Sequence, residues 1–143
     1  MAVTTEAVVI GGGVMGTSIL YNLVSRGVKA PVLLERDPLG SGSTGRSSGV
    51  IRMHYSTEVN TRLAWESYSI FMDFPEIVGG DIAFVKTGFL LCVPEEAIGG
   101  LKHNIAIQQS VGVPTSIISR EEAQEIAPGF VLNDGEAFGW EPE

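Results

Sequence analysis

Three glycines at fixed spacing, set between two apolar runs, constrain the fold of this chain more than any other feature. The pattern is Gly-x-Gly-x-x-Gly, formed by Gly11, Gly13 and Gly16. Residues 6–10 before it contain the run AVVI, which is apolar and largely β-branched, as in a short strand covered on both faces. Residues 14–26 after it place apolar side chains at helical spacing. A second apolar run covers residues 31–35. We therefore predict strand, helix and strand, a βαβ unit whose two strands are parallel.

Each position of the glycine pattern has its own task in such a unit. Gly11 lets the chain turn sharply out of the first strand, and Gly13 has no Cβ to keep a pyrophosphate away from the backbone. Gly16 lets the helix pack close to the strand. At Val14 and Met15 the helix begins, where unpaired N–H groups and the helix dipole attract phosphate. The pattern predicts a turn that binds a dinucleotide.

An acidic residue closes the second apolar run. Glu35 follows Gly16 by 19 residues, at the expected end of the second strand, where a carboxylate accepts hydrogen bonds from the ribose hydroxyls of an adenosine. A carboxylate there also repels a 2′-phosphate, which disfavours NADP. FAD and NAD both contain this adenosine, so the pattern leaves both open. The alternative is a tight turn without a ligand, with Glu35 as a surface charge.

Composition sets the broad class of protein. The 143 residues are 44% hydrophobic and 18% charged, enough for a folded core of about one domain. A net charge of −8 with no Lys/Arg cluster excludes a nucleic-acid partner. The single cysteine, Cys92, indicates a reducing compartment. We see no signal peptide, no membrane-spanning run and no metal-ligand cluster, and we predict a cytoplasmic protein with no membrane partner.

A Gly/Ser-rich segment follows the βαβ unit. Residues 40–49 hold four glycines and four serines, which fits a flexible linker or a ligand loop, and their place after a nucleotide-binding strand favours the loop. Ser119 and Glu122 have the spacing of a capping box. Beyond the loop we predict helices over 58–74, 97–111 and 119–126, a strand or a hairpin over 84–93 bent at Gly88, and a further strand from 137 to 140.

The sequence from Leu34 to Tyr55, LERDPLGSGSTGRSSGVIRMHY, resembles the FAD-dependent amine and amino-acid oxidoreductases of the D-amino-acid oxidase superfamily, in particular its sarcosine oxidase β-subunit branch. GGGVMG, TGFLL, SREEAQEIAP and WEPE extend the resemblance along the chain. It implies an α/β fold, with a Rossmann-like βαβ FAD-binding unit in residues 1–80 and the start of an α+β substrate domain in residues 81–143. Members of this family are longer, so the chain resembles an N-terminal fragment, and we expect residues 1–143 alone to bind flavin weakly or not at all.

The resemblance also implies roles for individual residues. Glu35 would bind the adenosine ribose, and Arg36 would flank the adenine. Ser43 and Thr44 would contact the pyrophosphate or ribityl region. Beside the isoalloxazine would run Ser47, Ser48 and Gly49. These residues, with the turn positions Gly11, Gly13, Val14, Met15 and Gly16, make up the predicted FAD site.

Arg52 matches an arginine that pairs with the substrate carboxylate in the monomeric sarcosine oxidases. Its planar guanidinium suits a bidentate carboxylate contact. Two positions depart from the family pattern. Gly49 stands where those oxidases have a basic residue beside the flavin, which leaves a dehydrogenase open, and Cys92 does not match their flavin-tethering cysteine, so we interpret it as a buried strand residue. We interpret His54 and Tyr55 as a polar loop pair.

The favoured function is FAD-dependent oxidation of the C–N bond of a small secondary amine or amino acid, which leaves an imine that water hydrolyses. Its partners would be that substrate and either another subunit or the remainder of a longer chain. Two alternatives stay open: an NAD-dependent dehydrogenase, and a non-catalytic subunit or truncated product that binds a nucleotide.

Overall fold

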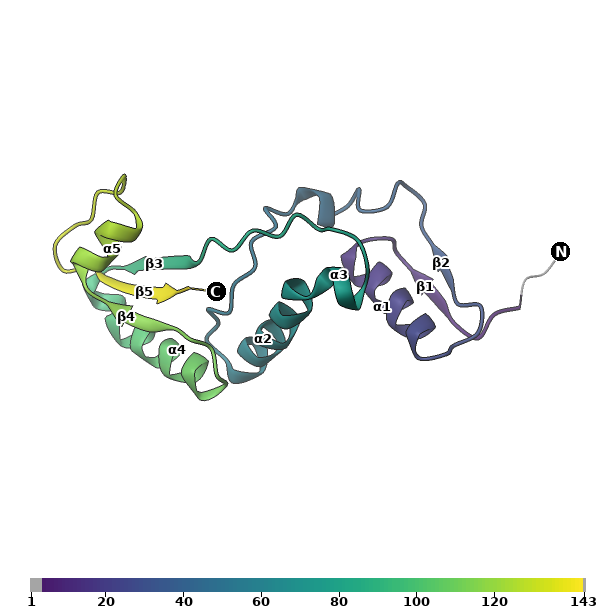
Figure 1. The fold of residues 1–143 in the computed structure, drawn as a ribbon, viewed down its shortest axis with the longest axis horizontal. Helices are drawn as coiled ribbons and strands as arrows, with labels where there is room; N and C mark the ends of the chain where they lie inside the picture. Colours follow the sequence, from purple (N-terminus) through teal and green to yellow (C-terminus); the bar gives the residue numbers. More distant parts are fainter. Residues whose placement is uncertain (1–3, 143) are drawn as a thin grey trace. The chain divides into compact units, whose positions relative to one another are not determined.

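The computed structural model describes residues 4–142, and the chain forms two compact units, Met1–Val50 and Ile51–Glu143 (Figure 1). The units divide after Val50, earlier than the boundary that we placed after residue 80. That boundary concerned which residues serve the flavin and which the substrate, and this division of roles stays a prediction.

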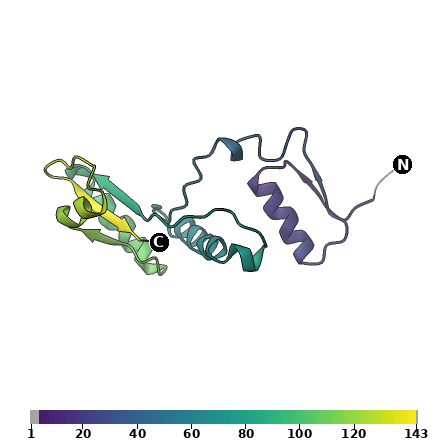
Figure 2. The same ribbon diagram turned by 45° about the horizontal axis from the view of Figure 1, so that its top comes forward.

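The first unit is the predicted βαβ unit. Strand β1 (Val8–Ile10) leads through the glycine turn into helix α1 (Val14–Ser25), and strand β2 (Val32–Leu34) follows (Figure 2). The two strands are parallel, and Val9 is opposite Leu33 in the register. After α1 the chain takes a positive φ of 83° at Gly27, a conformation that glycine adopts without strain. The predicted order of elements in this unit is confirmed.

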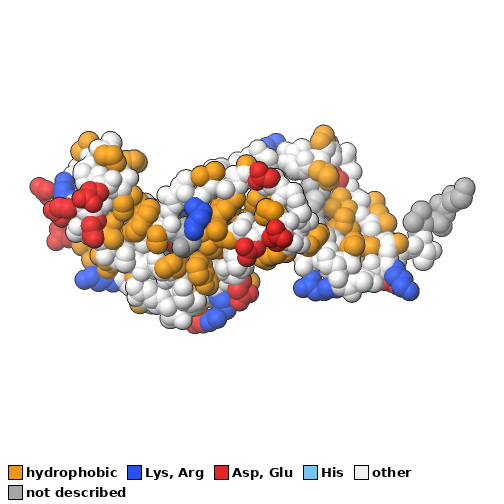
Figure 3. All heavy atoms as spheres, viewed as in Figure 1, with side chains coloured by type: hydrophobic (Ala, Val, Ile, Leu, Met, Phe, Trp, Pro, Cys, Tyr) orange, Lys and Arg blue, Asp and Glu red, His pale blue; other side chains and the backbone are white. Residues whose placement is uncertain are grey.

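Burial in the first unit differs from our expectation of a strand covered on both faces. Val9 is buried against α1, but Val8 and Ile10, which alternate with it, are 51% and 84% exposed. Leu34, opposite Ile10, is 53% exposed. Hydrophobic side chains are accordingly visible on the surface of this unit in Figure 3. Within the described residues of the unit, one face of the strand pair is covered and the other is open to solvent.

The Gly/Ser-rich segment is folded back on the glycine turn. Gly40 donates a backbone hydrogen bond to the carbonyl of Gly12 at 2.9 Å. Within the segment, Gly45 donates to the carbonyl of Gly40 at 2.7 Å, and a Cβ at Gly45 would lie 2.6 Å from that oxygen. A short 3₁₀ helix, η1, covers Thr44–Arg46. These bonds favour the interpretation as a ligand loop over that as a free linker.

The second unit combines helices with an antiparallel sheet, as expected for an α+β domain. The strands occur in the order β3-β5-β4, with β5 in the middle. Its elements are α2 (Glu58–Met72), α3 (Phe74–Ile77), β3 (Phe89–Val93), η2 (Glu95–Ala97), α4 (Ile98–Ser110), β4 (Ser116–Ile118), α5 (Arg120–Ile126) and β5 (Ala137–Glu141). At the start of α5, Ser119 and Glu122 form the predicted capping box.

Two expectations for the second unit were wrong, and one strand was missed. Residues 84–88 are not part of a strand, because the chain bends at Gly88 with a φ of 68° and only β3 continues beyond it. The predicted bend is real, and a Cβ at Gly88 would lie 2.1 Å from the Trp140 ring. Cys92 lies in β3 as predicted but is exposed and not buried. The short strand β4 was not predicted.

Two hydrophobic clusters hold the second unit together. One joins Met53, Tyr68 and Val113, with the Trp65 and Tyr68 rings stacked at a centroid distance of 5.5 Å. The other joins Ala123, Leu132 and Phe138. The first cluster includes Met53, the residue after Arg52, so the backbone beside the predicted substrate-binding arginine is anchored in a core.

Candidate cofactor site

The glycine turn has the geometry that a close approach of helix and strand requires. Gly11 has a φ of 106°, which L side chains rarely adopt. A Cβ at Gly16 would lie only 1.8 Å from the carbonyl oxygen of Gly11, so no other residue fits there without a backbone shift. These two glycines therefore make the turn and the close packing that we predicted, while their contact with a pyrophosphate stays a prediction.

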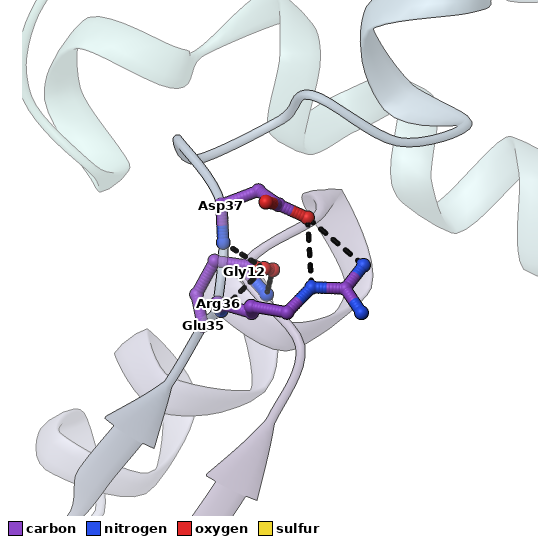
Figure 4. A network of polar contacts seen from close by, with 4 residues as sticks. All are labelled: Gly12, Glu35, Arg36 and Asp37. Carbon is purple, nitrogen blue, oxygen red and sulfur yellow. Dashed lines mark hydrogen bonds and ion pairs between the residues drawn. The ribbon is translucent and has the colours of Figure 1, made fainter.

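The carboxylate of Glu35 closes the turn from the end of β2 (Figure 4). Its Oε2 accepts a hydrogen bond from the Gly12 amide at 2.6 Å, and its Oε1 accepts from the amides of Arg36 at 2.7 Å and Asp37 at 2.9 Å. The amide of Asp37, followed by that of Gly12, lowers the pKa of Glu35, so the group stays ionised further into the acid range. Gly12 is a contact that the sequence did not indicate.

This arrangement limits what Glu35 can offer to a ligand. A carboxylate has about four acceptor positions, and three backbone amides already use three of them. About one position remains, enough for a single ribose hydroxyl. The Arg36 guanidinium bonds to Asp37 Oδ2 through Nε and Nη2 at 3.1 and 3.0 Å, and its side chain is 91% exposed.

Thr44 connects the loop to the first turn of α1. Its Oγ1 accepts a hydrogen bond from the Val14 amide at 3.0 Å, which supplies the cap that Gly13 cannot provide. A Cβ at Gly13 would lie 3.1 Å from this hydroxyl. The hydroxyl hydrogen is still available to donate to an anion. Val14 and Met15 are 57% and 72% exposed, so the start of α1 is open.

The other predicted loop residues lie on both sides of Thr44 in the chain. Ser43 precedes η1 as its N-cap, and the Ser47 hydroxyl accepts from the Gly49 amide at 3.1 Å. Gly49 has a φ of 69°, and Ser48 is exposed. Among the described hydrogen bonds, Thr44 joins the glycine turn, whereas Ser47, Ser48 and Gly49 do not. Their predicted position beside an isoalloxazine is neither supported nor contradicted by these contacts.

Arg52 belongs to the second unit, where aromatic rings flank its guanidinium. Its Cζ lies 5.3 Å from the centroid of the Phe89 ring and 5.8 Å from that of Tyr55. Both distances fall within the range of a cation–π interaction. The side chain is exposed, and no ion pair joins it to a carboxylate among residues 4–142. The charge is thus supported from its sides and available to an anion.

A buried polar cluster lies next to Arg52 in the chain and was missed by the sequence analysis. Glu141, 1% exposed, accepts a hydrogen bond from the Met53 amide at 2.8 Å. His54 Nδ1 lies 2.9 Å from Nε2 of Gln108, which is fully buried. Burial lowers the pKa of His54 and raises that of Glu141, and the Arg52 charge lowers both. Periodicity gives no signal for buried polar residues such as these.

The turn and loop together fit the ADP portion of FAD. The helix α1 has 12 residues, an exposed first turn and a glycine turn without side chains, and a threonine hydroxyl lies at its N-terminus. The one remaining acceptor position of Glu35 suits a ribose hydroxyl. In the part of the chain that the structure describes, no helix is long and apolar enough to span a membrane, and no group of three potential metal ligands gathers.

Known proteins are similar to this chain in sequence and in fold. The family model "FAD dependent oxidoreductase" (DAO) matches residues 6–141. A mitochondrial pyruvate dehydrogenase phosphatase regulatory subunit of Mus musculus is 29% identical over 130 residues, and mitochondrial sarcosine dehydrogenase of the same species is 28% identical over 133 residues. These matches cover 90% and 92% of this chain, but only 15% and 14% of the relatives.

A solved structure resembles nearly the whole chain. L-proline dehydrogenase from P. horikoshii is 36% identical and superposes with a TM-score of 0.89, covering 99% of this chain and 37% of that one. The chain thus spans only a part of the proteins that it matches. The family model covers almost the entire sequence and the fold agrees with it, so this chain belongs to the FAD-dependent oxidoreductase (DAO) family.

Proposed function

We propose that this chain is the FAD-binding, N-terminal part of an enzyme that oxidises the C–N bond of a small secondary amine bearing a carboxylate. The observation that carries the proposal is the glycine turn, locked by Glu35 and Thr44 and open at the first turn of α1. When bound, FAD supplies the two-electron acceptor for amine oxidation. The chain's own residues hold the nucleotide and place the substrate.

The substrate class follows from chemistry shared by two relatives. One relative is named for sarcosine and another for L-proline, and both compounds are secondary amines with one carboxylate. Arg52 supports this class, because an exposed guanidinium between two rings suits a carboxylate on an otherwise apolar ligand. In the proposed enzyme Arg52 orients the substrate by its carboxylate.

The proposed enzyme transfers its electrons to an acceptor other than oxygen. Gly49 carries no charge where the monomeric sarcosine oxidases have a basic residue, which favours a dehydrogenase. The relatives named for sarcosine and for L-proline are dehydrogenases, while another is named 4-methylaminobutanoate oxidase. We therefore expect an artificial dye acceptor to support turnover much faster than oxygen does. Comparable rates with both acceptors would contradict this part of the proposal.

An absorbance spectrum of the complete polypeptide that carries this chain tests the cofactor. Bound flavin has an absorption band at about 450 nm, whereas a reduced nicotinamide has one at about 340 nm. We expect the flavin band, and we expect L-proline or sarcosine to bleach it when oxygen is excluded. Purified protein without a flavin band, with NAD-dependent activity instead, would contradict the proposal.

A regulatory subunit is the second candidate function, because the mouse relative is named as one. Such a subunit would keep the nucleotide turn without turning over an amine. Retained FAD that none of sarcosine, L-proline or glycine reduces, together with co-elution with a partner protein in gel filtration, would favour this candidate.

A further inference from the structure

We propose that Glu141 and Gln108 are positioning residues, which hold the segment from Arg52 to His54 and thereby aim the Arg52 guanidinium at the substrate carboxylate. The inference rests on the proposed function in one respect: it takes Arg52 as the residue that binds this carboxylate. It adds to the substrate-binding arrangement two residues that are distant from Arg52 in the sequence, Glu141 of β5 and Gln108 of α4.

The first anchor is the bond from Glu141 to the Met53 backbone. Oε1 of Glu141 accepts from the Met53 amide at 2.8 Å, and both residues are almost fully buried. Strand alternation puts Glu141 on the same face of β5 as Gly139, which packs against Leu101 and Ile105 of α4. The carboxylate therefore extends into the layer between sheet and helix and fixes the residue that follows Arg52.

The second anchor holds His54, on the other side of Met53. Gln108 lies on the buried face of α4 with Leu101 and Ile105, and its Nε2 lies 2.9 Å from His54 Nδ1. Because the amide Nε2 donates, His54 accepts at Nδ1 and carries its hydrogen on Nε2. Two consecutive residues after Arg52 are thus tied to two different elements of the unit.

Stability alone does not account for these polar groups. His54 Nε2, Gln108 Oε1 and Glu141 Oε2 are buried, and among the described residues no hydrogen-bond partner satisfies them. Buried polar atoms without partners reduce the free energy of unfolding. A protein with apolar residues of similar size at such sites is often as stable or more stable. A cluster with this cost beside the substrate-binding arginine points to a task other than packing.

The same elements support the Arg52 side chain. Phe89 is the Cα partner of Glu141 across the β3–β5 pair, and its ring lies 5.3 Å from Arg52 Cζ. The His54 and Phe89 ring centroids are 6.3 Å apart. The backbone anchor and the ring beneath the guanidinium therefore meet at one end of β5, so a change at Glu141 alters both supports of Arg52.

The test uses the complete, FAD-loaded polypeptide with L-proline and sarcosine as substrates. The variants are Glu141→Leu, Glu141→Gln, Gln108→Leu, Arg52→Ala and the double variant Arg52→Ala/Glu141→Leu, with Glu125→Gln on exposed α5 as the control. We expect Glu141→Leu to raise KM about tenfold with little change in kcat, and Gln108→Leu to act in the same direction. Glu141→Gln keeps an oxygen for the Met53 amide, so its effect is smaller. The double variant should be no worse than Arg52→Ala, because the two residues act through one contact.

Amide hydrogen exchange supplies a readout that does not depend on activity. The Met53 amide should exchange faster in Glu141→Leu than in the wild type, and less so in Glu141→Gln, while the amides of α2 remain unchanged. If Glu141→Leu fails to fold, the comparison of Glu141→Gln and Gln108→Leu with the wild type carries the test.

The outcomes separate the inference from the proposed function. If Arg52→Ala raises KM but the Glu141 and Gln108 variants do not, or if their effects add to that of Arg52→Ala, the positioning role is wrong and the proposed function stands. Unchanged exchange at Met53 in these variants also overturns the inference. If Arg52→Ala leaves KM unchanged, the carboxylate assignment fails, and the positioning role falls with it for that reason.

Discussion

The Glu35 carboxylate accepts a hydrogen bond from the Gly12 amide, with 2.6 Å between Oε2 and the nitrogen. Through this bond the end of β2 holds the glycine turn at the N-terminus of α1 in place. A carboxylate predicted only to bind a ribose thus also maintains the shape of the glycine turn, and loss of its charge is expected to affect both.

We therefore expect acid to release FAD only at a pH below the ordinary pKa of a glutamate. Three amides lower the pKa of Glu35 below its ordinary 4.5, so its contribution is fully present above pH 4.5 and is lost only as the pH falls through the lower folded value. Glu35→Gln cannot accept from all three amides, and we expect it to bind FAD about tenfold or more weakly at neutral pH. FAD fluorescence during an acid titration measures both effects. An unchanged release profile in Glu35→Gln would contradict this role, and Glu125→Gln is the control.

Substitution of Gly16 should disrupt the turn itself. The Cβ of Gly16→Ala would lie 1.8 Å from the Gly11 carbonyl oxygen, so the backbone must move, at a cost of about 1–3 kcal/mol or more. We expect a lower melting temperature and loss of FAD. Gly100→Ala is the matched control, since no atom lies within 4 Å of its Cβ and alanine favours helix α4 by about 0.5–1 kcal/mol. Equal effects of the two substitutions would refute the steric argument.

The Thr44 hydroxyl should stabilise α1 from outside the helix. Thr44→Val keeps the shape of the side chain but leaves the Val14 amide without its acceptor, which is expected to cost about 1 kcal/mol. Thr44→Ser retains the oxygen and should behave more like the wild type. Thermal unfolding with and without FAD measures the difference, and identical melting of the valine and serine variants would rule out the cap.

Arg52 should determine substrate affinity. Loss of a bidentate contact between charged groups costs about 1.5–3 kcal/mol, so Arg52→Ala should raise KM for L-proline by about 10- to 100-fold. Arg52→Lys keeps the charge without the planar fork, so its KM should lie between those of the wild type and Arg52→Ala. Arg62→Ala, which removes an exposed pair with Glu58, is the control for loss of an arginine. Steady-state kinetics tests this, and pyrrolidine, which lacks the carboxylate, should be insensitive to Arg52→Ala.

His54 should make the folded state less stable as the pH falls below neutrality. Burial and the Arg52 charge lower its pKa below 6.5, so the folded state disfavours the protonated ring. Its contribution is full above pH 6.5 and declines as the pH falls from there toward the folded value. Melting temperatures between pH 8 and pH 5 should show this decline in the wild type and a weaker one in His54→Asn. His103→Asn, at an exposed position, is the control for loss of a histidine.

Local patterns predicted the local elements of the fold. The glycine spacing located β1, α1 and β2, and the Ser119 and Glu122 spacing located the start of α5. The strand β4 was missed because three residues, Ser116–Ile118, show no alternation that a window can detect. The bend at Gly88 was foreseen, but the packing of the Trp140 ring against it was not, because Trp140 belongs to β5, far along the sequence.

Burial was the property that sequence reasoning predicted least well. The apolar character of Val8 and Ile10 suggested two covered faces, yet burial depends on what packs against a strand and not on its own composition. Likewise Glu141 and Gln108 look like surface residues in the sequence, and only the pairing of β5 with β3 and the packing of α4 place them inside. The glycine turn was foreseen, but the contact of Glu35 with Gly12 required coordinates.

The bond from Met53 to Glu141 joins residues 88 positions apart. During synthesis on the ribosome, the Met53 amide therefore cannot bond to Glu141 until the whole intervening segment has been made. Contacts of such long sequence separation form slowly, since the entropy of closing the intervening segment must be met first. During translation the glycine turn is able to assemble early, whereas the segment from Arg52 to His54 stays without this anchor until β5 has emerged.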